Sequence, residues 1–105
     1  MPIVSSKKSA PSSVPLRGEA LKTYKQQLKT GWKVIRGHHI EKEYTFKDFA
    51  QALAFTNKVG ALAEKENHHP DIVLSWGKVK IILWTHSVGG LSEKDFQFAV
   101  KCELI

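Results

Sequence analysis

The feature that most constrains the fold is a long amphipathic segment that stops at Pro70. Thr45, followed three residues later by Asp48, is typical of a capped helix start. Beyond it the segment places a polar and an apolar stripe at helical spacing, with Lys47, Gln51, Lys58 and Lys65 opposite Phe49, Leu53, Phe55, Val59 and Leu62. The proline ring disfavours helical geometry at His69 and removes an amide donor. One long helix is therefore expected to end just before Pro70.

Shorter patterns on both sides of this segment predict two more helices and four strands. The first helix is expected over residues 19–29, with Gly31 as the residue that ends it. The expected strands are residues 32–36, 40–46, 71–75 and 78–86. Ser92 followed by Asp95 predicts the cap of a last helix. This order favours an α+β domain, in which a four-stranded antiparallel sheet carries three helices packed on one face.

Composition limits the class of protein. Residues 1–16 combine Ser, Pro and Lys without apolar periodicity, which predicts a disordered tail, and residues 17–105 are expected to form one domain. No apolar run approaches the roughly 20 residues that span a bilayer, and a single cysteine, Cys102, excludes an internal disulfide and is expected to be a buried structural thiol. The formal charge is +6, but the basic residues are scattered among ten acidic ones, which does not favour nucleic-acid binding. A cytoplasmic protein is expected.

The second predicted hairpin carries histidines at both of its ends. If Trp76 and Gly77 form the turn, the two strands pair outward from Ser75 and Lys78. Directly opposed residues share one face of a sheet, with Cβ atoms about 5 Å apart. Extending this pairing predicts a cluster at one rim, with His69 opposite Trp84 and Asn67 opposite His86. Strand alternation turns His68 elsewhere.

Three imidazoles near one rim suit two kinds of chemistry. Imidazole has an unperturbed pKa of about 6.5, so one ring can remove a proton while another delivers one. Elimination or addition of water needs that division of labour. Three histidines can also form a catalytic zinc set, but adjacent residues of an extended chain point to opposite faces, which makes His68 and His69 a poor chelating pair. Acid–base chemistry is favoured, and metal binding is the alternative.

The motifs "EKENHHPD", "SWGKVKIILWTH" and "GLSEKDF" resemble those of the pterin-4a-carbinolamine dehydratases. The likeness extends upstream to "GW" at Gly31, "FKDF" at Phe46 and the glutamate at Glu64. The specific combination is a glutamate, three residues, His-His-Pro, and a third histidine preceded by threonine in the next strand. Members of that family dehydrate 4a-hydroxytetrahydropterins to the quinonoid dihydropterin. The resemblance therefore implies an enzyme of tetrahydrobiopterin recycling.

The resemblance also implies which residues form the site. His68, His69 and His86 would be the catalytic trio, of which one protonates the leaving 4a-hydroxyl, another accepts the N5 proton and the third orients the pterin. The three histidines would also bind the substrate, together with Asn67, Trp84, Thr85 and Ser87. Glu64 would orient a histidine. The family implies no metal and no other cofactor.

The expected partners follow from the same resemblance. They are a pterin substrate, further copies of the chain in a homodimer or homotetramer, and an aromatic amino acid hydroxylase as a functional link. Neither nucleic acid nor a membrane is expected as a partner. A function of a different class is a protein-interaction module, because dehydratases of this family can act as dimerisation cofactors of transcription factors in animals.

Several of these residues also have a simpler structural explanation. Thr85 is a β-favouring strand residue, and Trp84 fits a half-buried sheet aromatic as well as a platform for a ligand. Asp95 is explained by capping of the last helix rather than by chemistry. His38 and His39 lie in the first hairpin, where nothing is expected to converge on them. They are interpreted as surface residues.

Overall fold

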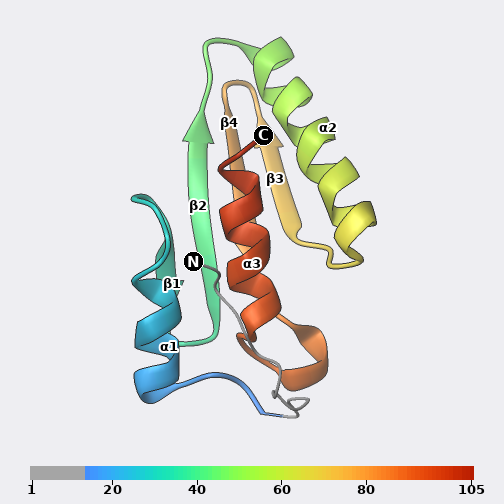
Figure 1. The fold of residues 1–105 in the computed structure, drawn as a ribbon. Helices are drawn as coiled ribbons and strands as arrows, with labels where there is room; N and C mark the ends of the chain where they lie inside the picture. Colours follow the sequence, from blue (N-terminus) through green and yellow to red (C-terminus); the bar gives the residue numbers. More distant parts are fainter. Residues whose placement is uncertain (1–13) are drawn as a thin grey trace.

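The computed structural model describes residues 14–105 and shows a sheet with its helices on one side (Figure 1). Four antiparallel strands lie in the order β1-β2-β4-β3. Along the chain the elements are α1 (Gly18–Lys25), β1 (Lys33–Ile35), β2 (His39–Thr45), α2 (Phe49–Glu66), β3 (Asp71–Ser75), β4 (Lys78–Leu83), the 3₁₀ helix η1 (His86–Val88) and α3 (Glu93–Cys102). The predicted α+β fold and its order of helices and strands are confirmed.

The start of the described chain already contacts the domain. Residues 1–13 of the predicted N-terminal tail lie outside the described residues. The N–H of Leu16 donates to the carbonyl of Leu91 at 2.8 Å, and the Leu16 side chain packs against the core. Pro15 lies against Gly90, where a Cβ would come within 2.8 Å of the proline ring.

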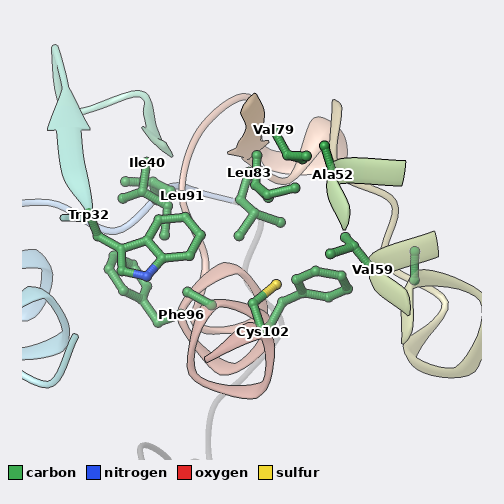
Figure 2. Packing of buried hydrophobic residues seen from close by; sticks show 13 residues of the cluster. Trp32, Ile40, Ala52, Val59, Val79, Leu83, Leu91, Phe96 and Cys102 are labelled. Atoms are coloured by element: carbon green, nitrogen blue, oxygen red, sulfur yellow. The ribbon is translucent and has the colours of Figure 1, made fainter. Parts of the chain in front are cut away.

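The core lies between the sheet and the helices. Alternate residues of β4, namely Val79, Ile81 and Leu83, are buried, as expected when one face of a strand meets the core. Figure 2 shows Val79 and Leu83 beside side chains from the helices. The buried cluster is completed by Trp32, Ile40, Ala52, Val59, Ala63, Leu91, Phe96, Phe98, Ala99 and Cys102. This packing fixes α3 across the sheet, and the candidate site is built at the N-terminal end of α3.

The cap of α2 differs from the predicted one. Asp48, not Thr45, is the N-cap, because its Oδ1 accepts the N–H of Gln51 at 2.9 Å. Thr45 cannot take this role because it is the last residue of β2 and pairs with Lys78. The N-cap is therefore three residues further along the chain than the pattern predicts.

The inner face of α2 agrees only in part with the predicted apolar stripe, since Val59 is buried and Phe55 and Leu62 pack against the core. Its buried residues are Ala52, Val59 and Ala63, whereas Phe49 and Leu53 are 42% and 40% exposed. The small side chains allow the helix to lie close to the sheet. Phe49 and Leu53, one turn apart, are left on the outer side of the helix.

The first helix is shorter than predicted. It ends at Lys25 rather than at residue 29, because the N–H groups of Gln27 and Leu28 donate to carbonyls three residues back, at 3.0 and 3.1 Å. These tight turns bring the chain towards the sheet. Gly31 then has φ +102°, and a Cβ at that position would lie 2.8 Å from the Lys42 side chain. The position therefore requires glycine.

The single cysteine is a buried thiol, as predicted. Cys102 is 1% exposed at the end of α3. Burial, assisted by the neighbouring Glu103 carboxylate, raises the pKa of the Cys102 thiol to about 12. The thiol therefore stays protonated at neutral pH and has a structural role.

Candidate active site

A fully buried carboxylate, Asp95, is at the centre of the candidate site. It lies in the first turn of α3 with no exposed surface. One oxygen, Oδ1, is 2.6 Å from Nε2 of His68, and the other, Oδ2, accepts the hydroxyl of Thr85 at 2.8 Å and the N–H of Ser92 at 2.9 Å. An ionised carboxylate can only accept, so Nε2 of His68 is assigned the hydrogen. The other ring nitrogen of His68, Nδ1, is then the one able to accept a proton.

The hydroxyl groups of Thr85 and Ser92 complete this network. Their Oγ atoms are 2.6 Å apart, and Thr85 gives its own hydrogen to Asp95. Ser92 therefore donates to Thr85, and Ser92 Oγ accepts the N–H of Lys94 at 3.3 Å. Ser92 and Asp95 form the predicted capping box of α3. Capping alone, however, does not account for Asp95, because the same carboxylate also binds a histidine.

The exit of α2 determines where the adjacent histidines point. Asn67 is left-handed, with φ 53° and ψ 42°, a conformation that asparagine tolerates. The N–H groups of Asn67 and His68 both point to the carbonyl of Ala63. After this turn the His68 side chain is only 12% exposed, whereas that of His69 is 55% exposed. Nε2 of His69 lies 2.6 Å from Oε2 of the exposed Glu64, so the predicted pairing of Glu64 with a histidine is present in the geometry.

The third histidine lies just beyond β4 and packs on an indole. The rings of Trp84 and His86 are stacked, with centroids 3.9 Å apart and planes 22° apart. His86 is exposed at the start of η1, and Ser87 beside it is also exposed. Thr85, between Trp84 and His86 in the chain, donates to Asp95. One tripeptide therefore connects His86 to the His68–Asp95 pair.

The predicted strand register is correct within the hairpin but not beyond it. The observed pairs include Ser75 with Lys78 and Ile72 with Ile81. Pairing ends at Asp71 with Ile82, and Asn67 is a helix cap rather than a strand residue. The predicted pairs of His69 with Trp84 and of Asn67 with His86 are therefore wrong. Instead, His68 contacts Asp95 of α3, His69 contacts Glu64 of α2, and His86 stacks on Trp84.

Sequence reasoning missed His38, which the fold brings to the same region. Its ring lies on Trp84, with centroids 4.5 Å apart, and its Nδ1 is 3.1 Å from Nδ1 of His39. Both histidines are half-buried. The pairing of Ile40 with Leu83 explains the contact, because it brings the start of β2 beside Trp84. Local pattern gives no information about which hairpin strands become neighbours.

A second polar cluster lies at the other end of α3, around Glu103. Oε2 of Glu103 accepts hydrogen bonds from Trp32 Nε1 at 3.2 Å, from Lys42 Nζ at 2.8 Å and from the hydroxyl of Tyr44. Burial alone would raise the pKa of the Glu103 carboxyl, but these hydrogen bonds outweigh burial and hold the pKa below its usual range. Burial, reinforced by the bond to Glu103, raises the pKa of Tyr44. This cluster joins the end of α3 to the sheet.

The structure also bears on metal and membrane binding. Within residues 14–105, no three His, Cys, Asp or Glu side chains form a group that could hold a metal ion. The same part of the chain has no helix with the length and apolar character needed to cross a membrane. An open groove of about 450 Å³ lies between α1 and β1, and its lining, which includes Leu21, Lys22, Lys25, Trp32 and Lys33, contains no histidine.

Comparison with known sequences gives a consistent set of relatives. The family model described as "Pterin 4 alpha carbinolamine dehydratase" matches residues 14–105. A protein of Alkaliphilus metalliredigens, provisionally named a pterin-4-alpha-carbinolamine dehydratase, is 55% identical over 100 residues, covering 92% of this chain and 90% of the relative. A protein of Rubrobacter xylanophilus with the same provisional name is 47% identical over 89 residues, covering 85% and 82%.

Two solved structures have a similar fold. A transcriptional coactivator/pterin dehydratase from Brucella melitensis is 31% identical, with a TM-score of 0.79, and the match covers 86% of this chain and 96% of that one. A pterin dehydratase-like protein described as a RuBisCO assembly factor in the alpha-carboxysome is 25% identical, with a TM-score of 0.60 and coverage of 70% and 87%.

Proposed function

The chain belongs to the pterin-4a-carbinolamine dehydratase family, and we propose that it removes water from 4a-hydroxytetrahydropterins to give the quinonoid dihydropterin. In such a substrate C4a carries the hydroxyl and the adjacent N5 carries a hydrogen. The hydroxyl gains a proton and leaves as water, while N5 loses its proton and its electrons form the C4a=N5 bond. One acid and one base are therefore sufficient, and the protons balance.

His68 is suited to be the base. Its Nε2 is bonded to Asp95, which fixes the tautomer and leaves Nδ1 with a lone pair. The buried carboxylate also stabilises the positive charge that arrives with the N5 proton. Because Asp95 is itself held by Thr85 and Ser92, the ring is positioned before the substrate binds.

His86 is suited to be the acid. Its ring is exposed and stacked on Trp84, and an aromatic face attracts a protonated ring. A protonated His86 can deliver its proton to the leaving hydroxyl and recover one from water. His69, held by Glu64, would then orient the pterin, with Asn67 and Ser87 as further exposed contacts.

The observation that best supports this proposal is the bond between His68 and a carboxylate with no exposed surface. A buried carboxylate on an imidazole is the arrangement that prepares a histidine for proton transfer. Thr85, which donates to Asp95, directly precedes His86, so the hydrogen-bonded network that holds His68 extends to the neighbour of a second imidazole. The proposed activity would place the chain in tetrahydrobiopterin recycling in the cytoplasm, as a functional partner of an aromatic amino acid hydroxylase.

Stopped-flow dehydration of a synthetic 4a-hydroxytetrahydropterin tests the proposal. Purified protein in the presence of a chelator is expected to accelerate water loss, and His68→Ala and His86→Ala are each expected to lower kcat about a hundredfold or more. Lys58→Ala, on the exposed part of α2, is the control and should keep full activity. An active wild type with two equally active histidine variants would contradict the assignment of the site.

The same experiment separates the enzyme from the alternative function. A non-catalytic interaction module would show no acceleration with the wild type, and its partner would bind the histidine variants as well as the wild type. The Brucella structure described as a transcriptional coactivator makes this comparison relevant. Turnover by the wild type that is lost in both histidine variants favours the dehydratase.

We also propose that the chain forms a homodimer or homotetramer with α2 in the interface. Phe49 and Leu53 lie one turn apart on α2 and are 42% and 40% exposed, so a second copy could cover both side chains. Light scattering after gel filtration should give a mass above that of one chain for the wild type and a lower mass for Phe49→Glu. Trp76→Glu, which changes a more exposed aromatic in the β3–β4 turn, is the control. A monomeric wild type would contradict this proposal.

A further inference from the structure

The β1–β2 turn presents a histidine ring in a fixed orientation. Arg36 and Gly37 both have positive φ, 50° and 69°, and the N–H of His38 donates to the carbonyl of Ile35 at 2.9 Å. His38 therefore leaves the turn in a defined direction. Its Nδ1 is 3.1 Å from Nδ1 of His39, so one ring donates to the other.

The His38 ring is the first of three rings in contact. It lies 4.5 Å from Trp84 between centroids, with planes 45° apart. Trp84 in turn stacks on His86 at 3.9 Å. The indole is therefore the shared neighbour of a turn histidine and a proposed catalytic histidine. Contacts between aromatic rings contribute a stabilising free energy in addition to that of burying their surface.

The three proposed catalytic histidines are held by different kinds of partner. His68 is held by Asp95 and His69 by Glu64, each through a hydrogen bond of 2.6 Å. Among residues 14–105 the His86 ring has no hydrogen-bonded carboxylate of this kind, and its ring contact is with Trp84. The orientation of His86 thus depends on an indole, and the orientation of that indole depends on what supports it.

We propose that His38 is a positioning residue that holds Trp84 against His86. This inference rests on the proposed function, because it gives His38 an effect on catalysis through His86. His38 supplies a flat ring, and His39 supports that ring through the Nδ1 contact. Charge transfer and proton transfer by His38 are not required. Removing the ring should leave Trp84 free to move and His86 without a defined position.

Two variants separate the role of the ring from a role in proton transfer. His38→Ala removes the support and is expected to lower kcat about two- to tenfold, the size of one aromatic contact. His38→Phe keeps a flat ring without titratable nitrogens and is expected to restore most of kcat. Lys33→Ala, an exposed change in the preceding strand, should have no effect.

NMR of the His86 ring protons provides a readout that does not depend on turnover. In the wild type the stacked indole should shift these signals upfield through its ring current. His38→Ala should move them towards the position of an unstacked histidine, and His38→Phe should not. Thermal unfolding of each variant checks that the fold is intact.

The outcomes distinguish this inference from the proposed function. Unchanged His86 signals in folded His38→Ala would overturn the positioning role, as would altered signals with wild-type kcat. Failure of His38→Phe to restore kcat would show that a flat ring at this position is not sufficient, and would also overturn it. A wild type without turnover would refute the dehydratase function, while the NMR comparison would still test whether His38 positions His86.

Discussion

Asp95→Asn is expected to lower kcat between about a hundredfold and ten-thousandfold while the protein remains folded. The carboxylate accepts hydrogen bonds on both oxygens, from His68 on one side and from Thr85 and Ser92 on the other. An amide has one accepting oxygen and one donating nitrogen, so it cannot satisfy both sides. If the amide oxygen faces Thr85, its NH₂ faces His68. His68 must then move its hydrogen to Nδ1, the atom proposed to take the N5 proton.

The substitution also affects stability, and the control must account for that. A mismatched buried polar group costs about 1–3 kcal/mol, so the unfolding midpoint of Asp95→Asn should fall measurably. Asp48→Asn is a matched control, since Asp48 also caps a helix but contacts no histidine. It should keep wild-type kcat. Wild-type turnover in folded Asp95→Asn would show that His68 does not depend on this carboxylate.

Sequence pattern predicted the parts of the fold that depend on neighbouring residues. α2 ends before Pro70, as predicted, although the residue that ends it is the left-handed Asn67. The Trp76–Gly77 turn fixes the β3–β4 register because its effect is confined to adjacent backbone. The inner face of α2 was less predictable. Phe49 and Leu53 fit a helical apolar stripe, yet both are partly exposed, whereas the small residues Ala52 and Ala63 are buried. Which residues face inward depends on how closely the helix packs on the sheet, and the sequence pattern does not give that packing.

For the candidate site, too, the sequence pattern did not predict contacts between residues that are far apart in the chain. The histidines were recognisable from their positions at the ends of the predicted hairpin and from the resemblance, but their partners were not. The carboxylate of Asp95 already had a sufficient local explanation as a capping residue, and its contact with His68 crosses 27 positions in the sequence. His38 reaches Trp84 only because β2 pairs with β4. Both contacts arise from tertiary packing, which a periodic pattern does not encode.

Glu103→Ala is expected to lower the free energy of unfolding by about 2–4 kcal/mol, because one carboxylate oxygen holds three side chains. Lys42, Tyr44 and Trp32 all donate to it, and the Glu103 and Lys42 side chains are only 14% and 15% exposed. The variant would leave a largely buried ammonium group without its partner. Glu66→Ala is the control, since Glu66 makes one ion pair, with the more exposed Lys101. Its free energy of unfolding should fall by less than that of Glu103→Ala.

The free energy by which the Glu103 carboxylate stabilises the fold should depend on pH in a defined direction. Burial opposes ionisation of Glu103, but its hydrogen bonds prevail and the pKa is lowered in the folded state. A glutamate in the unfolded chain titrates near pKa 4.3, so the stabilisation is complete above that pH and is lost as pH falls through the folded value. Wild type and Glu103→Gln should therefore differ most in urea unfolding at neutral pH and converge in acid. A difference that grew in acid would mean that the ionised carboxylate does not stabilise the fold.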